Sequence, residues 1–123
     1  MSAPSSSILQ GRRVLVVEDR YLIANELAQE VQALGGQVVG PCPSVAQAKA
    51  LIANQQIDIA LLDVNLDGEF VYPVAQALES KGVPMIFLTG YDEAVLPAEW
   101  GGRPRLLKPV ARGALREEFA KVI

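Results

Sequence analysis

Short continuous hydrophobic runs alternate along this chain with stretches in which hydrophobic residues recur every three or four positions. The continuous runs predict strands that are buried on both faces, over residues 13–17, 37–40, 57–62, 84–88 and 105–107. The wider spacing predicts helices over residues 23–34, 44–54 and 70–80, and a further helix in the tail. Strands that alternate with helices pair in parallel through right-handed crossovers. The pattern therefore predicts an α/β fold with a single doubly wound parallel sheet of five strands.

Turn-forming residues mark several of the predicted boundaries. Pro41-Cys42-Pro43 is expected to end the second strand after Gly40, because proline cannot donate to a sheet ladder. Ser44 is placed to cap the next helix, with Gln47 three residues later as its capping-box partner. Asp67-Gly68 indicates a turn between the third strand and the helix that follows it.

Length and composition exclude several classes of protein. The 123 residues suffice for one domain, and the Ser-rich residues 1–10 are predicted to form a flexible leader before a domain at 11–123. A net charge of −3 without a broad basic patch argues against direct nucleic-acid binding, and the apolar runs are too short to cross a membrane. The single cysteine, Cys42, excludes an internal disulfide and fits a reducing cytoplasm. With no histidine, a zinc site and a histidine-dependent hydrolase are disfavoured.

Polar residues follow four of the five predicted strands. Glu18 and Asp19 follow the first strand, Asp63 the third, Thr89 the fourth and Lys108 the fifth. Ligands of such sheets bind beyond the carboxyl ends of the strands. We therefore expect these five side chains, distant in sequence, to meet at one edge of the sheet.

Three carboxylates in one crevice repel each other unless a cation joins them, and Mg²⁺ prefers oxygen ligands of this kind. Asp19 and Asp63 are the expected direct ligands, with the backbone carbonyl of Asn65 as a third. Glu18 is placed to hold a metal-bound water. The formal charge of the three acids then balances that of Mg²⁺ and Lys108.

This set of residues suits phosphoryl transfer, in which catalysis is mainly positioning and electrostatics. A carboxylate oxygen of Asp63 can attack a phosphoryl group in line, while Lys108 offsets charge on its oxygens. Thr89 can donate a hydroxyl hydrogen bond that exists only in the modified state, which makes it a candidate switch.

The chain also resembles the receiver domains of bacterial response regulators. The resemblance covers nearly all of the chain after the leader and rests on motifs at residues 16–19, 61–65, 88–90 and 107–109. It implies a flavodoxin-like strand order of 2-1-3-4-5. It also implies that a histidine kinase or a phosphotransfer protein phosphorylates Asp63 and so switches binding to a downstream protein. By resemblance Asp19 is the direct Mg²⁺ ligand with Glu18 as its partner, and the Lys108–Pro109 peptide bond is cis.

The segment from residue 84 to residue 91 is similar to an atypical branch of receivers with a Phe-Ala-Thr-Gly-Tyr motif, although Leu88 replaces the usual alanine. The interval from Thr89 to Lys108 is short, so the fourth helix is expected to be short, absent or mobile. Arg105 stands where an aromatic switch residue is common, so either Tyr91 takes over that role or the coupling is missing. We expect residues 91–104 to be the most mobile part of the domain and to order on phosphorylation. The branch also implies a kinase of the HWE or a related type.

Two other functions compete with this interpretation. An aspartyl-phosphate hydrolase places its nucleophile after the first strand of its core and a second aspartate two positions later, where this chain has Asn65. Turnover of a phosphate ester would favour that enzyme, whereas a receiver at most phosphorylates itself and slowly loses the group. The other alternative is a degenerate receiver that only docks partners, which failure to bind Mg²⁺ or to accept phosphate would favour. Trp100 is expected to be a surface or loop anchor.

Overall fold

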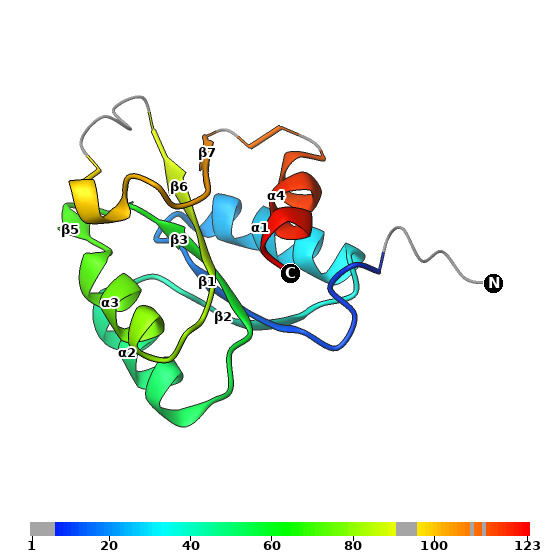
Figure 1. The fold of residues 1–123 in the computed structure, drawn as a ribbon, viewed down its shortest axis with the longest axis horizontal. Coiled ribbons are helices and arrows are strands. Elements are labelled where there is room, and N and C mark those ends of the chain that lie inside the picture. Colours follow the sequence, from blue (N-terminus) through cyan, green and yellow to red (C-terminus); the bar gives the residue numbers. More distant parts are fainter. Residues whose placement is uncertain (1–6, 91–95, 109, 112) are drawn as a thin grey trace.

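The computed structural model describes residues 7–90, 96–108, 110–111 and 113–123 (Figure 1). Its main elements run in the order β1 (Arg13–Val17), α1 (Tyr21–Ala33), β2 (Gln37–Cys42), α2 (Val45–Asn54), β3 (Ile59–Asp63), β4 (Asn65–Leu66), β5 (Glu69–Phe70), α3 (Tyr72–Ser80), β6 (Met85–Thr89), η3 (Ala98–Trp100), β7 (Arg105–Leu107) and α4 (Ala114–Val122).

Five parallel strands form one sheet in the order β2-β1-β3-β6-β7, which confirms the predicted fold and strand order. In the register of the central strands, Val16 lies beside Leu61 and Asp63 lies beside Leu88. Because all five strands run the same way, their carboxyl ends share one edge of the sheet. The short strands β4 and β5 form a separate antiparallel hairpin that the hydrophobic pattern did not predict.

Helices cover both faces of the sheet. Figure 1 shows α2 and α3 on one side and α1 and α4 on the other. The α2–α3 side packs on Leu15, Leu62 and Phe87. The opposite side packs on neighbours of these residues in the strands, including Val16 and Ile86. This alternation confirms that the continuous hydrophobic runs are strands buried on both faces.

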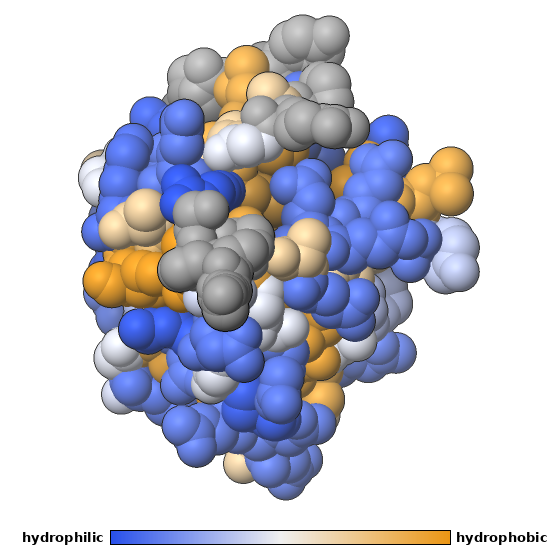
Figure 2. Space-filling view, turned by 90° about the vertical axis from the view of Figure 1, so that its right-hand side faces the viewer, coloured by the Kyte–Doolittle hydropathy of each residue, from blue (hydrophilic) through white to orange (hydrophobic). Residues whose placement is uncertain are grey.

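Figure 2 shows the face of the molecule that lies on the right of Figure 1. Its surface is mostly hydrophilic and carries separate hydrophobic patches, as is ordinary for a protein surface. Among the residues that the structure describes, no helix is both long enough and apolar enough to cross a membrane.

The prediction that β2 ends at Gly40 is wrong, because the strand continues through Pro41 to Cys42. Gly40 has a φ of 96°, and the register between β1 and β2 shifts between Leu15 and Val17. Proline is tolerated here since β2 is the edge strand and one of its sides needs no ladder partner. After the shift, Val17 pairs with Cys42, whose thiol is buried and has its pKa raised to about 11 by that burial.

The predicted cap at the start of α2 is confirmed. The backbone N–H of Gln47 donates to Ser44 Oγ at 3.2 Å, and Ser44 has the extended backbone of an N-cap residue.

The segment between β6 and β7 holds a single 3₁₀ turn over its described part, residues 96–104. Of the two expectations for Trp100, a surface position is wrong and a loop anchor is confirmed, since its side chain is buried in the core on the α2–α3 side. Trp100 packs edge-on against Phe87 with ring centroids 6.0 Å apart, and Leu96 is buried in the same cluster. Tyr91 and the start of the segment expected to be mobile lie outside the described residues.

The end of the expected leader packs against the domain. Leu9 is fully buried in the cluster on the α1–α4 side, and Ile8 packs against that cluster. The backbone N–H of Leu9 donates to the carbonyl of Leu34 at 2.9 Å, which ties this segment to the end of α1. The folded unit therefore includes residues before Gly11.

Because Leu9 fills core space, we expect Leu9→Ala to lower the free energy of unfolding by about 2 kcal/mol. Urea unfolding followed by circular dichroism measures the change, with Gln10→Ala, at an exposed neighbouring position, as the matched control. Equal stability of the two variants would show that the segment before Gly11 contributes no packing.

Candidate functional site

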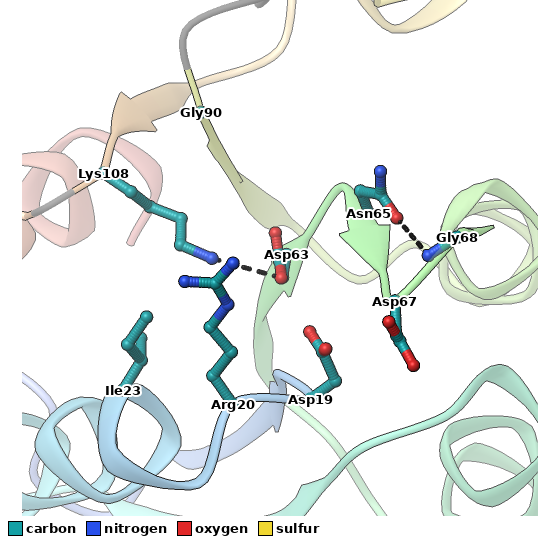
Figure 3. A pocket seen from close by; sticks show the side chains of 9 residues that line it. All are labelled: Asp19, Arg20, Ile23, Asp63, Asn65, Asp67, Gly68, Gly90 and Lys108. Atoms are coloured by element: carbon teal, nitrogen blue, oxygen red, sulfur yellow. Dashed lines mark hydrogen bonds and ion pairs between the residues drawn. The ribbon is translucent and has the colours of Figure 1, made fainter.

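A pocket of about 680 Å³ opens at the carboxyl edge of the sheet, where the five predicted site residues were expected to meet (Figure 3). Its lining comes from the loops after β1, β3, β6 and β7 and from the β4–β5 hairpin, and consists of Asp19, Arg20, Ile23, Asp63, Asn65, Asp67, Gly68, Gly90 and Lys108. The topology therefore brings together residues up to 90 positions apart in the sequence.

Three carboxylates gather at this edge. Glu18, Asp19 and Asp63 each offer an oxygen atom, and these atoms lie within 4.8 Å of one another. The carboxylate of Glu18 is buried beneath the pocket floor, while Asp19 is half-buried and faces the pocket. Asp63 is the last residue of β3 and is 4% exposed.

Lys108 is the basic side chain that pairs with these acids. Its Nζ lies 3.1 Å from Glu18 Oε1 and 3.2 Å from Asp63 Oδ2. The backbone N–H of Lys108 donates to the carbonyl of Thr89 at 2.7 Å. The pairing of β6 and β7 therefore fixes the backbone position of Lys108. One cation thus serves two buried carboxylates.

The ionisation of Asp63 is disfavoured in this setting. Burial is the main cause, and the charge of Glu18 is the next; together they raise the pKa of Asp63 from 3.8 to about 7 against the lowering effect of Lys108. The lysine partner lowers this pKa, but burial and the neighbouring carboxylate outweigh it. Perturbed pKa values of this kind cluster at functional sites.

Comparison with known proteins identifies the family. The family model of the response regulator receiver domain matches residues 14–120. The chain belongs to this family. The receiver family thus accounts for nearly the whole described domain, from β1 to α4.

Several known proteins are similar to this chain in sequence or in structure. The sensory transduction protein LytR of Streptococcus mutans is 30% identical over 89% of this chain and 47% of its own length. The solution structure of SdrG from Sphingomonas melonis Fr1 is 36% identical, with a TM-score of 0.80 over 89% of this chain and 93% of that chain. The response regulator PhyR from Brucella abortus is 28% identical, with a TM-score of 0.80 over 95% of this chain and 49% of that chain. This chain spans about half the length of the first curated relatives it matches.

Thr89 stands at the end of β6, next to the pocket. Its hydroxyl Oγ1 is buried and has no hydrogen-bond partner among the described residues of the receiver domain. Gly90 follows in the pocket lining, and no atom of the described residues, its chain neighbours apart, lies within 4 Å of where a Cβ would stand. A buried hydroxyl without a partner is costly unless a ligand or a second state of the protein satisfies it.

Asn65 has a structural role that the sequence did not predict. Its Oδ1 accepts a hydrogen bond from the backbone N–H of Gly68 at 2.6 Å. Asp67 and Gly68 both have positive φ values, 55° and 94°, as a two-residue hairpin turn requires. The predicted turn at Asp67-Gly68 is therefore confirmed, and the hairpin it closes forms one wall of the pocket.

The structure brings the predicted residues Glu18, Asp19, Asp63 and Lys108 into one cluster, with Thr89 adjoining it. Sequence analysis missed Arg20, which also lines the pocket. The sequence did contain a signal for Arg20: it comes directly after the acidic pair and therefore lies in the same loop. Pro109, and with it the expected cis bond, lies outside the described residues.

The donor set fits a hard divalent cation. All three clustered ligand atoms are carboxylate oxygens, which Mg²⁺ prefers, and Lys108 pairs with two of these three acids. The residues present therefore match the acidic site expected of a receiver domain.

Proposed function

We propose that this receiver domain accepts a phosphoryl group on Asp63 in a Mg²⁺-dependent reaction and thereby switches its binding to a downstream protein. The observation that carries the proposal is the position of Asp63, a buried carboxylate at the floor of the pocket, grouped with two further acids and paired with Lys108.

The proposed reaction transfers one phosphoryl group. A carboxylate oxygen of Asp63 forms the new O–P bond while the N–P bond of a phosphohistidine breaks. The electron pair of that bond stays on the imidazole nitrogen, which gains a proton if the ring leaves as imidazolium. With acetyl phosphate an O–P bond breaks instead, and acetate leaves with the electron pair.

Two residues of this chain are placed to stabilise the transferred group. The Nζ of Lys108, already 3.2 Å from Asp63 Oδ2, can pair with a phosphoryl oxygen. The unpartnered hydroxyl of Thr89 can donate to another oxygen, and this bond would exist only after transfer. Such a bond gives the switch a local trigger.

Asp19 and Asp63 would hold Mg²⁺ directly, with the backbone carbonyl of Asn65 and a water held by Glu18 as two further oxygen ligands and solvent water as the rest. When bound, Mg²⁺ supplies positive charge against the phosphoryl oxygens. SdrG, 34% identical over 99% of this chain, has a BeF₃-activated conformation, and BeF₃⁻ is a chemical mimic of a phosphoryl group on a carboxylate. This relative supports acceptance of a phosphoryl group by the present chain.

The proposed donor is the phosphohistidine of a kinase, of the HWE or a related type, or of a phosphotransfer protein, in the cytoplasm. The proposed output is a change in protein–protein contacts and not turnover of a substrate.

The deciding experiment is intact mass spectrometry after incubation with acetyl phosphate, with Mg²⁺ and with EDTA. We expect one phosphoryl adduct with Mg²⁺, none with EDTA, and none on Asp63→Asn, which keeps the size of the side chain and removes the nucleophilic oxygen pair. An adduct that survives in Asp63→Asn would contradict the assignment.

A mimic of the phosphoryl group decides the remaining case. If acetyl phosphate leaves the protein unmodified, titration with BeF₃⁻ and Mg²⁺, followed by ¹⁹F nuclear magnetic resonance, tests the same pocket without a kinase. No bound BeF₃⁻ signal would favour a docking module that accepts no phosphate. Turnover of a phosphate ester would favour the hydrolase.

A further inference from the structure

Arg20 is a cation in the pocket that the proposed mechanism does not use. Figure 3 shows its side chain reaching from the loop after β1 across the pocket toward Asp63 and Lys108. The guanidinium has no hydrogen-bond or ion-pair partner among the residues that the structure describes. Five N–H donors therefore lie beside the pocket in which Asp63 is proposed to accept a phosphoryl group.

The backbone of Arg20 is held from both sides. Its N–H donates to Glu18 Oε2 at 3.1 Å, and its carbonyl accepts from the N–H of Ala24 at 2.8 Å in the first turn of α1. Arg20 is also the N-cap residue of α1, with extended φ and ψ of −87° and 116°. Glu18, which pairs with Lys108 through its other oxygen, thus positions both cations of the pocket.

The charge of the site changes by one unit on phosphorylation. Glu18, Asp19 and Asp63 carry three negative charges, which Lys108 and one Mg²⁺ balance with three positive charges. An aspartyl phosphate carries two negative charges where the carboxylate carried one. The modified pocket then has four negative charges against three positive ones.

Arg20 can supply the missing positive charge. Arg20 and the other charged residue of the lining, Asp67, are both exposed, and Asp67 lies on the hairpin turn. A guanidinium pairs with phosphoryl oxygens through two parallel N–H···O bonds, a geometry that lysine does not offer.

We propose that Arg20 is a second cationic anion-binding residue of this site, which pairs with the phosphoryl oxygens alongside Lys108. The inference rests on the proposed function, since it concerns the group that Asp63 accepts. It predicts that Arg20 favours the modified state over the resting state.

The test compares the affinity for BeF₃⁻ at saturating Mg²⁺ in the wild-type protein, Arg20→Gln and Arg20→Lys, by ¹⁹F nuclear magnetic resonance. We expect Arg20→Gln to bind BeF₃⁻ about tenfold more weakly, the usual effect of losing one charge-assisted contact. Arg20→Lys should recover part of this loss, because it keeps the charge but not the paired donors.

Arg12→Gln is the matched control, since it removes the same charge from an exposed arginine at the opposite, amino end of β1. Mg²⁺ affinity, measured separately by calorimetry, should be unchanged or tighter in Arg20→Gln, because a nearby positive charge has gone. A merely structural role of Arg20 would weaken both ligands together. Urea unfolding checks that each variant is folded.

The outcomes separate the two proposals. A wild-type protein that binds BeF₃⁻ while Arg20→Gln stays within twofold of it overturns the role of Arg20 and leaves the proposed function standing. Equal losses in Arg20→Gln and Arg12→Gln overturn it too, because they reflect net charge alone. A wild-type protein that neither binds BeF₃⁻ nor accepts phosphate overturns both proposals.

Discussion

We expect Asp63→Asn to stabilise the metal-free protein at pH 8, by on the order of 2–4 kcal/mol. Most core substitutions destabilise, so this sign is distinctive. It follows from a buried carboxylate that shares one lysine with Glu18 and so lacks a full charge partner. Asparagine has almost the same shape and carries no charge to desolvate.

The effect depends on pH because the pKa of Asp63 is raised in the folded state to about 7 from 3.8. Below about pH 4 the carboxyl is neutral in both folded and unfolded chains, so its ionisation does not affect stability. Between about pH 4 and 7 the unfolded chain releases a proton that the folded chain retains, so the stability of the wild-type protein falls as pH rises. Above about pH 7 the loss is complete.

Urea unfolding in EDTA at pH 5.5 and pH 8 measures the prediction. The advantage of Asp63→Asn should be larger at pH 8 than at pH 5.5. Added Mg²⁺ should stabilise the wild-type protein more than the variant, because Asp63 is a proposed ligand. A variant less stable than the wild type at pH 8, or a difference that ignores pH, would contradict the charge argument.

The same arrangement favours a functional role for the site over a purely structural one. A core optimised for stability would not place three carboxylates within 4.8 Å around one lysine. Local features that disagree with stability are typical of functional sites. The shortage of positive charge at rest leaves room for a cation, and the unpartnered hydroxyl of Thr89 leaves a donor for an incoming group.

Most of the fold was readable from the sequence, because strands buried on both faces leave continuous apolar runs that local turns seldom imitate. The site followed from topology, since polar residues at the ends of parallel strands must share an edge. Asp63 was the clearest case, as a charged residue directly after the run Ile59–Leu62 has little reason to be there otherwise.

The errors have a common physical origin in tertiary contacts. Pro41 predicts a strand end only if its strand is not an edge, and edge position is a property of the whole sheet. Leu9 lies in a polar, Ser-rich stretch. It is buried because the chain folds back on the end of α1, where the backbone of Leu9 also forms a hydrogen bond. The position of Asn65 depends on the β4–β5 hairpin, and that of Arg20 on the N-cap of α1. Neither feature produces a periodic pattern in the sequence.

Trp100 anchors its loop in the core, and we expect Trp100→Ala to lower the free energy of unfolding by about 3–5 kcal/mol. The side chain is 1% exposed and lies in the same core cluster as α2 and α3. It packs edge-on against Phe87 of β6, and the guanidinium of Arg103 lies 5.2 Å from the centre of its ring. Arg103 also pairs with Glu79 of α3, so this cation links the segment after η3 to the neighbouring helix.

The large expected loss has a specific cause in this fold. The described residues 96–104 contain a single 3₁₀ turn, and the sequence pattern predicted no long helix there. Two side chains of this segment, Leu96 and Trp100, are buried in the same core cluster as Phe87. Tryptophan has the largest side chain of the amino acids, so its removal leaves a large cavity. A turn this short can move only a little to fill that cavity.

Urea unfolding followed by far-ultraviolet circular dichroism measures the loss, since the variant has no tryptophan fluorescence. Trp100→Phe, which keeps an aromatic ring against Phe87, should lose less than half as much. Arg103→Gln should lose at most about 1 kcal/mol, because both of its contacts are partly exposed. If Trp100→Ala costs no more than Arg103→Gln, the indole is a surface group and the receiver core ends at β6. If the expected order holds, one aromatic side chain supports the part of the sheet that leads to the proposed phosphoryl-acceptor site.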